Sequence, residues 1–167
     1  MALFQHDLKG LLAYSTISHL GLITLLFGLD SRLAAVAAIF HIINHATFKA
    51  SLFMAAGIID HETGTRDMRR INGMWKYMPH TAALAMVASL AMAGVPLLNG
   101  FISKEMMLEE AAHAVWRGMP WLVGGVATFA ALISVAYALR MIVHVFLGPV
   151  RDDYPAKPHD PGIGLWL

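Results

Sequence analysis

The chain contains four long apolar runs separated by polar connectors, at residues 10–29, 33–59, 81–98 and 121–147. A helix over the first run would be about 30 Å long, which matches the hydrocarbon core of a bilayer. Hydrophobic residues make up 57% of the sequence and charged residues 14%. A soluble domain has about 25% charged residues. The sequence therefore predicts an all-α, polytopic bundle of transmembrane helices.

The third run ends in AGVPLLNGF, which is rich in residues that disfavour a continuous helix. One straight helix over residues 81–115 would be about 50 Å long, too long for a single span. We therefore predict one discontinuous helix, broken near residues 96–102. Ser103 is expected to cap a second half that begins at Lys104. The bundle then has about four or five spans.

Three ionisable residues share one face of the second run: His41, His45 and Lys49. Their spacing is i, i+4 and i+8, although a charge inside a bilayer costs about 3 kcal/mol or more. A neutral His accepts a proton at one ring nitrogen and donates from the other, and a Lys away from water can release and regain a proton. These three residues on one helix face therefore predict proton transfer. The alternative is interhelical hydrogen bonding to neighbours such as Asn44 or Thr47.

Two further residues are candidates for the same chemistry. His19 lies in the middle of the first run, where the alternative is a hydrogen bond to Ser15 or Ser18. Lys104 follows the predicted helix break, and broken helices at membrane depth commonly mark ion sites. The alternative for Lys104 is an ordinary loop position with local pairing to a nearby glutamate. No apolar run contains Asp or Glu, so an acidic partner for a lysine relay has to come from elsewhere.

Several classes of function are not supported. His41 and His45 have the spacing of a helical zinc pair, but the acidic residue and third ligand are missing, so no metal site is predicted. Cysteine is absent, which excludes disulfides and thiolate sites. The sequence has no phosphate-binding or dinucleotide-binding motif, so we expect no cofactor. The net charge of +1, without a basic patch, predicts no nucleic-acid partner.

Basic residues of the connectors gather on one side of the predicted membrane. The segment before the first run, the connector after the second and the tail after the fourth hold seven of them: Lys9, Arg66, Arg69, Arg70, Lys76, Arg151 and Lys157. The other side holds Arg32 and Arg117. The positive-inside rule places the first set in the cytoplasm.

Three motifs in order make the chain similar to a known superfamily: DLKGLLAYSTISHLG, FHIINHATFKASLFMAAGIIDHETGTRD and GVPLLNGFISKEM. They resemble the antiporter-like membrane proteins, which include the large proton-pumping membrane subunits of respiratory complex I and the large subunits of Mrp-type sodium/proton antiporters. The Mrp A subunit is the most similar. The resemblance covers about residues 2–147.

The resemblance implies two inverted half-repeats, each with a discontinuous helix, and a mid-membrane chain of Lys and His that carries protons. The positions that match this relay are His19, His41, His45, Lys49 and Lys104. Lys9 matches a family lysine near the cytoplasmic edge. Lys104 corresponds to the lysine that passes protons toward the outer exit.

The implied function is part of a multisubunit monovalent cation (Na⁺ or K⁺)/proton antiporter in a bacterial plasma membrane. The chain would then be an ion transporter subunit and not an enzyme, or part of a translocase if it belongs to an NADH:quinone oxidoreductase. Its expected partners are other antiporter subunits, membrane lipid, monovalent cations and protons. One alternative is a proton-pumping membrane subunit of a complex I-like or hydrogenase complex. Another is a structural or assembly subunit, in which His and Lys only connect helices.

The predicted organisation is a partial antiporter-like domain at residues 1–147, a polar loop at 148–161 and a possible start of the next transmembrane helix at 162–167. The upstream half-repeat of the family, with its Glu and first relay Lys, is not in the sequence. We therefore expect an internal fragment or a truncated reading frame that does not transport by itself.

Overall fold

The computed structural model describes residues 1–151, 154 and 157–162. These residues contain helices and connecting segments but no β-strand. The elements, in order, are a 3-10 helix Ala2–Phe4, α1 Leu8–Phe27, α2 Arg32–Thr63, α3 Met74–Tyr77, α4 Pro79–Ala93, α5 Asn99–His113, α6 Leu122–Met141 and a π-helix Ile142–Phe146.

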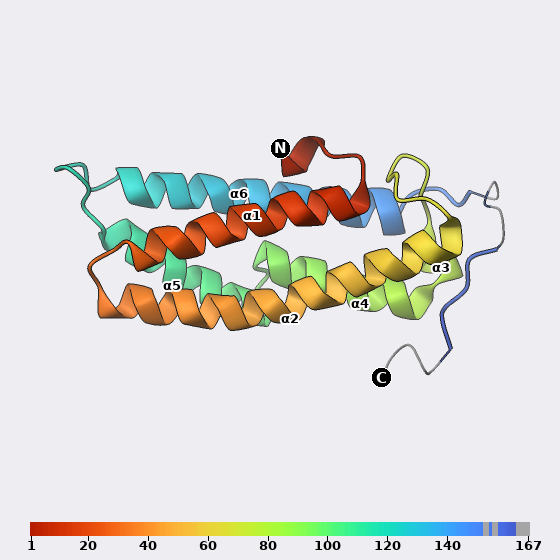
Figure 1. Cartoon of the computed structure of the whole chain (residues 1–167), viewed down its shortest axis with the longest axis horizontal. Helices are drawn as coiled ribbons and strands as arrows, with labels where there is room; N and C mark the ends of the chain where they lie inside the picture. The colour runs from red at the N-terminus through yellow and green to blue at the C-terminus, as the bar shows by residue number, and fades with distance from the viewer. Residues whose placement is uncertain (152–153, 155–156, 163–167) are drawn as a thin grey trace.

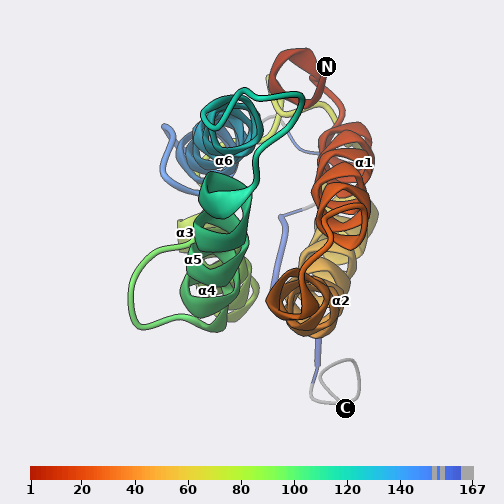
Figure 2. The ribbon, with the colours of Figure 1, turned by 90° about the vertical axis from the view of Figure 1, so that its left-hand side faces the viewer.

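The helices form an elongated bundle (Figure 1). Helices α1, α2 and α6 run along its length, and α4 and α5 follow one another along a fourth line. Seen along the bundle (Figure 2), α1 and α2 lie on one side, with α4, α5 and α6 on the other. Helix α2 packs against α1, α4 and α5, and α6 packs against α4 and α5. We call the end that contains α3 the basic end, and the end with residues 28–31 and 114–121 the opposite end.

Three helices are long and apolar enough to cross a membrane: Leu8–Phe27, Arg32–Thr63 and Leu122–Phe146. The shorter Pro79–Ala93 is also apolar. Large side chains on the outside of the bundle, such as Ile17 and Phe129, are 63% and 66% exposed. Helices that are apolar on their outer faces are typical of membrane spans. The predicted polytopic helix bundle is confirmed.

Local sequence explains where the long helices begin and end. The carboxylate of Asp7 caps α1 by accepting a hydrogen bond from the Gly10 amide at 2.6 Å. The Ser31 hydroxyl caps α2 in the same way, and α2 ends where Gly64 adopts a left-handed φ of 66°. The last predicted run is not α-helical throughout, because α6 continues from Ile142 as a π-helix.

The predicted discontinuous helix is present, but its second half begins earlier than expected. Helix α4 ends at Ala93, and Gly94 and Leu97 have φ values of 85° and 77°. Helix α5 then starts at Asn99 without a side-chain cap, so the prediction that Ser103 caps a helix starting at Lys104 is wrong. The chain has already turned at Leu97, which leaves Ser103 inside the first turns of α5.

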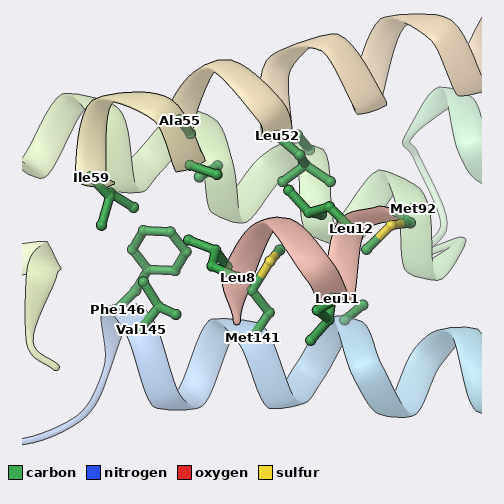
Figure 3. Close-up of a cluster of buried hydrophobic side chains, with 14 of the residues drawn as sticks. Leu8, Leu11, Leu12, Leu52, Ala55, Ile59, Met92, Met141, Val145 and Phe146 are labelled. Carbon is green, nitrogen blue, oxygen red and sulfur yellow. The ribbon is translucent and has the colours of Figure 1, made fainter. Parts of the chain in front are cut away.

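A buried apolar cluster near the basic end holds α1 between α2 and α6 (Figure 3). It combines side chains from α1, α2, α4, α6 and the π-helix, among them Leu8, Leu11, Leu12, Leu52, Ala55, Ile59, Met92, Met141, Val145 and Phe146. Close van der Waals packing of this kind stabilises helix association in lipid. The cluster sets the rotation of α1, so the next turns of its inner face, at Ser15 and His19, also point into the bundle.

The described tail residues pack onto the basic end. The Tyr154 hydroxyl accepts a hydrogen bond from the Asn72 amide at 3.0 Å. Asp160 accepts bonds from the amides of His80 and Thr81 at 3.0 and 3.1 Å and from the Thr81 hydroxyl at 2.8 Å. Burial alone would raise the pKa of Asp160, but these hydrogen bonds outweigh it and lower the pKa. The carboxylate therefore stays charged and complements the first turn of α4.

The division into residues 1–147, 148–161 and 162–167 stays a prediction. Only Gly162 of the last segment is described, and residues 163–167 lie outside the described residues.

Candidate functional site

Three histidine rings meet in the interior of the bundle. His41 and His45 come from one face of α2, and His19 reaches them from α1. His19 and His41 are 1% and 0% exposed, with ring centroids 5.2 Å apart in a stacked arrangement. Nδ1 of His19 lies 3.0 Å from Nε2 of His41, which is hydrogen-bonding distance. The packing of α1 on α2 thus joins two bases that are far apart in the sequence.

Each of these two rings has a second polar partner on another helix. His41 Nδ1 lies 3.0 Å from the hydroxyl of Ser103 on α5. His19 Nε2 lies 3.1 Å from the hydroxyl of Tyr137 on α6. Both ring nitrogens of His19 therefore contact other helices, and neither forms the alternative hydrogen bond to Ser15 or Ser18. The hydrogen-bonded pair therefore connects four helices.

His45 lies beside the pair without a direct hydrogen bond to it. Its ring centroid is 5.2 Å from that of His19 and 6.2 Å from that of His41. It is 8% exposed and packs edge-on against Phe48. Within the described residues, its Nε2 has no hydrogen-bond partner.

Lys49 is turned from the same face of α2 toward α1. It is 5% exposed, and its ammonium donates to the Leu12 carbonyl at 3.2 Å and to the Ser15 hydroxyl. Ser15 donates in turn to the Leu12 carbonyl at 2.8 Å. Because Ser15 and His19 are four residues apart on α1, the Lys49 site and the histidine cluster occupy adjacent turns of one helix face.

Lys104 is turned into the helix break and is 8% exposed. Its ammonium donates to the carbonyl of Ala93, the last residue of α4, at 3.2 Å and to the Ser134 hydroxyl at 2.7 Å. The last carbonyls of a helix lack intrahelical partners and carry partial negative charge, so the broken helix provides an acceptor for this cation. A Cβ at Gly94 would lie 2.9 Å from Lys104 Cδ, so glycine gives the side chain its space.

A small cavity lies between Lys104 and the histidine pair. It has a volume of about 20 Å³ and is lined by His19, His41 and Lys104, with apolar side chains around them. A cavity of about 10–15 Å³ or more has room for one water, but a bound water also needs polar partners. Both rings and the Lys104 side chain border this space, whose surface is mostly apolar.

Lys9 lies outside this buried cluster, at the basic end. Its ammonium forms a 2.8 Å ion pair with Asp60, and the two side chains are 36% and 30% exposed. Nearby, a cleft of about 530 Å³ is lined by both acidic and basic side chains, among them Asp7, Asp60, Arg66, Asp67 and Arg69. The role of Lys9 near the cytoplasmic edge stays a prediction.

Four hydroxyl groups contact the bases: Ser15, Ser103, Ser134 and Tyr137. The sequence did not predict Ser134 or Tyr137, and it assigned Ser15 to His19 and Ser103 to a helix cap. All four are at most 2% exposed. For Ser134 and Tyr137 the sequence signal is their i, i+3 spacing inside an apolar run. A polar residue on the inner face of a membrane helix indicates a buried partner.

Comparisons with known proteins identify a matching family and relatives of the chain. The model of the family NADH:quinone oxidoreductase/Mrp antiporter, TM, matches residues 1–134. The A/B subunit of a probable K(+)/H(+) antiporter of Rhizobium meliloti is 65% identical over 96% of this chain, which covers 16% of that relative. The A subunit of the Na(+)/H(+) antiporter of Alkalihalophilus pseudofirmus is 42% identical over 99% of this chain, which covers 23% of that protein.

A solved structure shows the same fold. The Mrp complex from Dietzia sp. DQ12-45-1b matches with a TM-score of 0.79 and 44% identity, over 84% of this chain and 16% of the matched chain. The resemblance to the Mrp A subunit is therefore confirmed. The chain spans less than a quarter of the length of the two antiporter subunits. The chain belongs to the NADH:quinone oxidoreductase/Mrp antiporter family of transmembrane proteins.

Proposed function

We propose that this chain is part of a multisubunit monovalent cation/proton antiporter and that it moves protons through an intramembrane Lys/His relay. The relay consists of His19, His41, His45, Lys49 and Lys104. The observation that carries the proposal is the direct contact of His19 Nδ1 with His41 Nε2 at 3.0 Å, beside a cavity that also contacts Lys104.

The geometry supports a path with two lysine ends. Lys49 and its acceptor Ser15 lie one turn from His19 on α1, so a proton released by Lys49 passes toward the histidine cluster. His19 and His41 share it across their hydrogen bond. The proposed next step is transfer from the pair to Lys104, which borders the same small cavity at the helix break, and from there toward the opposite end. Lys9, at the basic end, is the candidate for uptake.

The names of the relatives support the cation and partner assignments. One relative is named as part of a potassium/proton antiporter and another as part of a sodium/proton antiporter, so the proposed coupling ion is K⁺ or Na⁺. The matched structure is that of an Mrp complex, which supports other subunits as partners. The apolar outer faces of the helices would contact lipid in a bacterial plasma membrane. In this role the chain is a component of a transporter and not an enzyme.

Removal of either lysine tests the relay. In the native assembly, we expect Lys49→Ala and Lys104→Ala each to reduce cation-driven proton flux by about 100-fold or more, because each removes a proton-transfer group. The measurement is the dissipation of a pH gradient in inverted membrane vesicles after addition of Na⁺ or K⁺, with the amount of assembled complex quantified in parallel.

Lys76→Ala is the matched control, because Lys76 is an exposed lysine at the basic end. Its flux is expected to equal that of the unsubstituted protein. Normal flux in Lys49→Ala or Lys104→Ala, at normal complex levels, would remove the relay assignment.

The second candidate is a proton-pumping membrane subunit of a redox-driven complex. The family description, which includes NADH:quinone oxidoreductase, favours it. The gene neighbourhood separates the two candidates. Genes for small Mrp subunits beside this one support the antiporter, whereas genes for quinone reductase subunits support the pump.

A further inference from the structure

The contacts of Ser103 suggest an assignment for the proton of His41. Ser103 Oγ is 3.2 Å from the Gly100 carbonyl, which can only accept a hydrogen bond, and 3.0 Å from His41 Nδ1, which can donate or accept. Both contacts are satisfied together when Ser103 donates to Gly100 and accepts from His41 Nδ1. In a neutral His41 ring, Nε2 is left as the acceptor.

The assignment for His41 also fixes the donor and acceptor atoms of His19 and Tyr137. Because His41 Nε2 accepts, His19 Nδ1 is the donor across their 3.0 Å contact. A neutral His19 then has a lone pair at Nε2, so the Tyr137 hydroxyl donates to it at 3.1 Å. The donors run in one direction, from Tyr137 through His19 and His41 to Ser103. With Ser103 donating to Gly100, this arrangement of protons satisfies all of these contacts with neutral rings.

Tyr137 lies on the face of α6 that points into the bundle. It is 0% exposed on α6 and lies one turn after Ser134. Ser134 accepts from the Lys104 ammonium at 2.7 Å and donates to the Met92 carbonyl at 3.3 Å. One face of α6 therefore contacts both the histidine pair and the Lys104 end of the proposed relay.

We propose that Tyr137 is a positioning residue that holds His19, and through it His41, in the Nδ1–H tautomer. The inference rests on the proposed relay function. A tyrosine hydroxyl both donates and accepts, so Tyr137 can turn from donor to acceptor when His19 gains a proton at Nε2. Phenylalanine keeps the ring and its packing but removes the only donor that Nε2 of His19 contacts among the described residues.

The tautomers can be measured directly. In the native complex labelled with ¹⁵N-histidine, the ring nitrogen shifts of His19 and His41 are expected to show a protonated Nδ1 and an unprotonated, hydrogen-bonded Nε2. In Tyr137→Phe, the His19 signals are expected to shift to a mixture of tautomers. Tyr14→Phe is the matched control, because Tyr14 lies on α1 with its side chain outward and 42% exposed.

Transport provides the second readout. Loss of one buried hydrogen bond is expected to reduce proton flux about 5- to 20-fold in Tyr137→Phe, whereas Tyr14→Phe keeps the unsubstituted rate. An Nε2–H tautomer at His19 in the unsubstituted complex would overturn the proposal even if Tyr137→Phe fails to assemble. Unchanged spectra and flux in an assembled Tyr137→Phe complex would also overturn it.

The two proposals fail in different ways. Normal flux after removal of Lys49 and Lys104 would reject the relay, whatever the tautomer of His19. Loss of flux in those lysine variants, together with normal flux and spectra in Tyr137→Phe, would reject only the role of Tyr137.

Discussion

The buried lysines obtain their hydrogen-bond partners, within the described part of the chain, from hydroxyls and helix carbonyls and not from carboxylates. Lys49 donates to Ser15 and Lys104 to Ser134, each with a second bond to a backbone carbonyl. Glu110, a carboxylate on α5, instead accepts a hydrogen bond from Ser31 at the opposite end, at 2.8 Å. A hydroxyl can accept or donate, so it accommodates a base before and after proton transfer.

At the scale of single residues, the two α2 histidines separate proton transfer from a purely structural role. We expect the double variant His41→Gln and His45→Gln to assemble but to lose proton flux by about 100-fold or more, because Gln keeps hydrogen-bonding groups but does not exchange protons near neutral pH. Vesicle flux and complex abundance are the measurements. His113→Gln, at an exposed position, is the control. Intact transport in the double variant would favour the scaffold role.

The discontinuous helix matters at the scale of elements because it creates polar groups inside an apolar bundle. The end of α4 exposes the Ala93 carbonyl, and the start of α5 places Ser103 and Lys104 beside α2 and α6. Gly100 allows this arrangement, because a Cβ there would collide with the Ala91 carbonyl. Unpaired backbone groups at membrane depth are stable only where protein or water satisfies them.

Gly100→Ala tests that close approach. We expect the substitution to destabilise the bundle by about 1–3 kcal/mol, because the Ala91 carbonyl belongs to a helix backbone and cannot move alone. Thermal unfolding in detergent measures the effect. Gly125→Ala is the control: nothing lies within 4 Å of the place that its added methyl group would take, and alanine favours a helix. Equal stability of the two variants would contradict the packing explanation.

At the scale of the whole molecule, the connectors divide between two ends. The segment between α2 and α4 and the described tail lie at one end, and the α1–α2 and α5–α6 connections lie at the other (Figure 1). Three of the arginines, Arg66, Arg69 and Arg70, follow α2 at the basic end. The charge distribution therefore predicts that the basic end faces the cytoplasm.

Single cysteines can test this orientation, because the chain has no cysteine of its own. We expect His61→Cys, where the native side chain is 86% exposed, to react with a membrane-impermeant maleimide only in inverted vesicles. Val115→Cys, at a position 64% exposed, is expected to react only in right-side-out vesicles. The extent of labelling before and after membrane permeabilisation is the measurement. The reverse pattern would invert the topology.

Local patterns were enough to predict the spans, the helix break and the shared face of His41, His45 and Lys49. Run length, apolar composition and the helical period are properties of neighbouring residues, so they can be read before the chain folds. The start of α5 could not be predicted in this way, because it depends on a turn at Leu97 and on the contact of Gly100 with α4.

The partners of the bases were decided by tertiary structure. The contact between His19 and His41, and those of Lys104 with Ser134 and of His19 with Tyr137, join helices that are distant in the sequence. Sequence spacing orients a side chain around its own helix but does not specify which helix it meets. That choice follows from the packing of α1 and α6 around α2, α4 and α5, which places the hydroxyls within hydrogen-bonding distance of the buried bases.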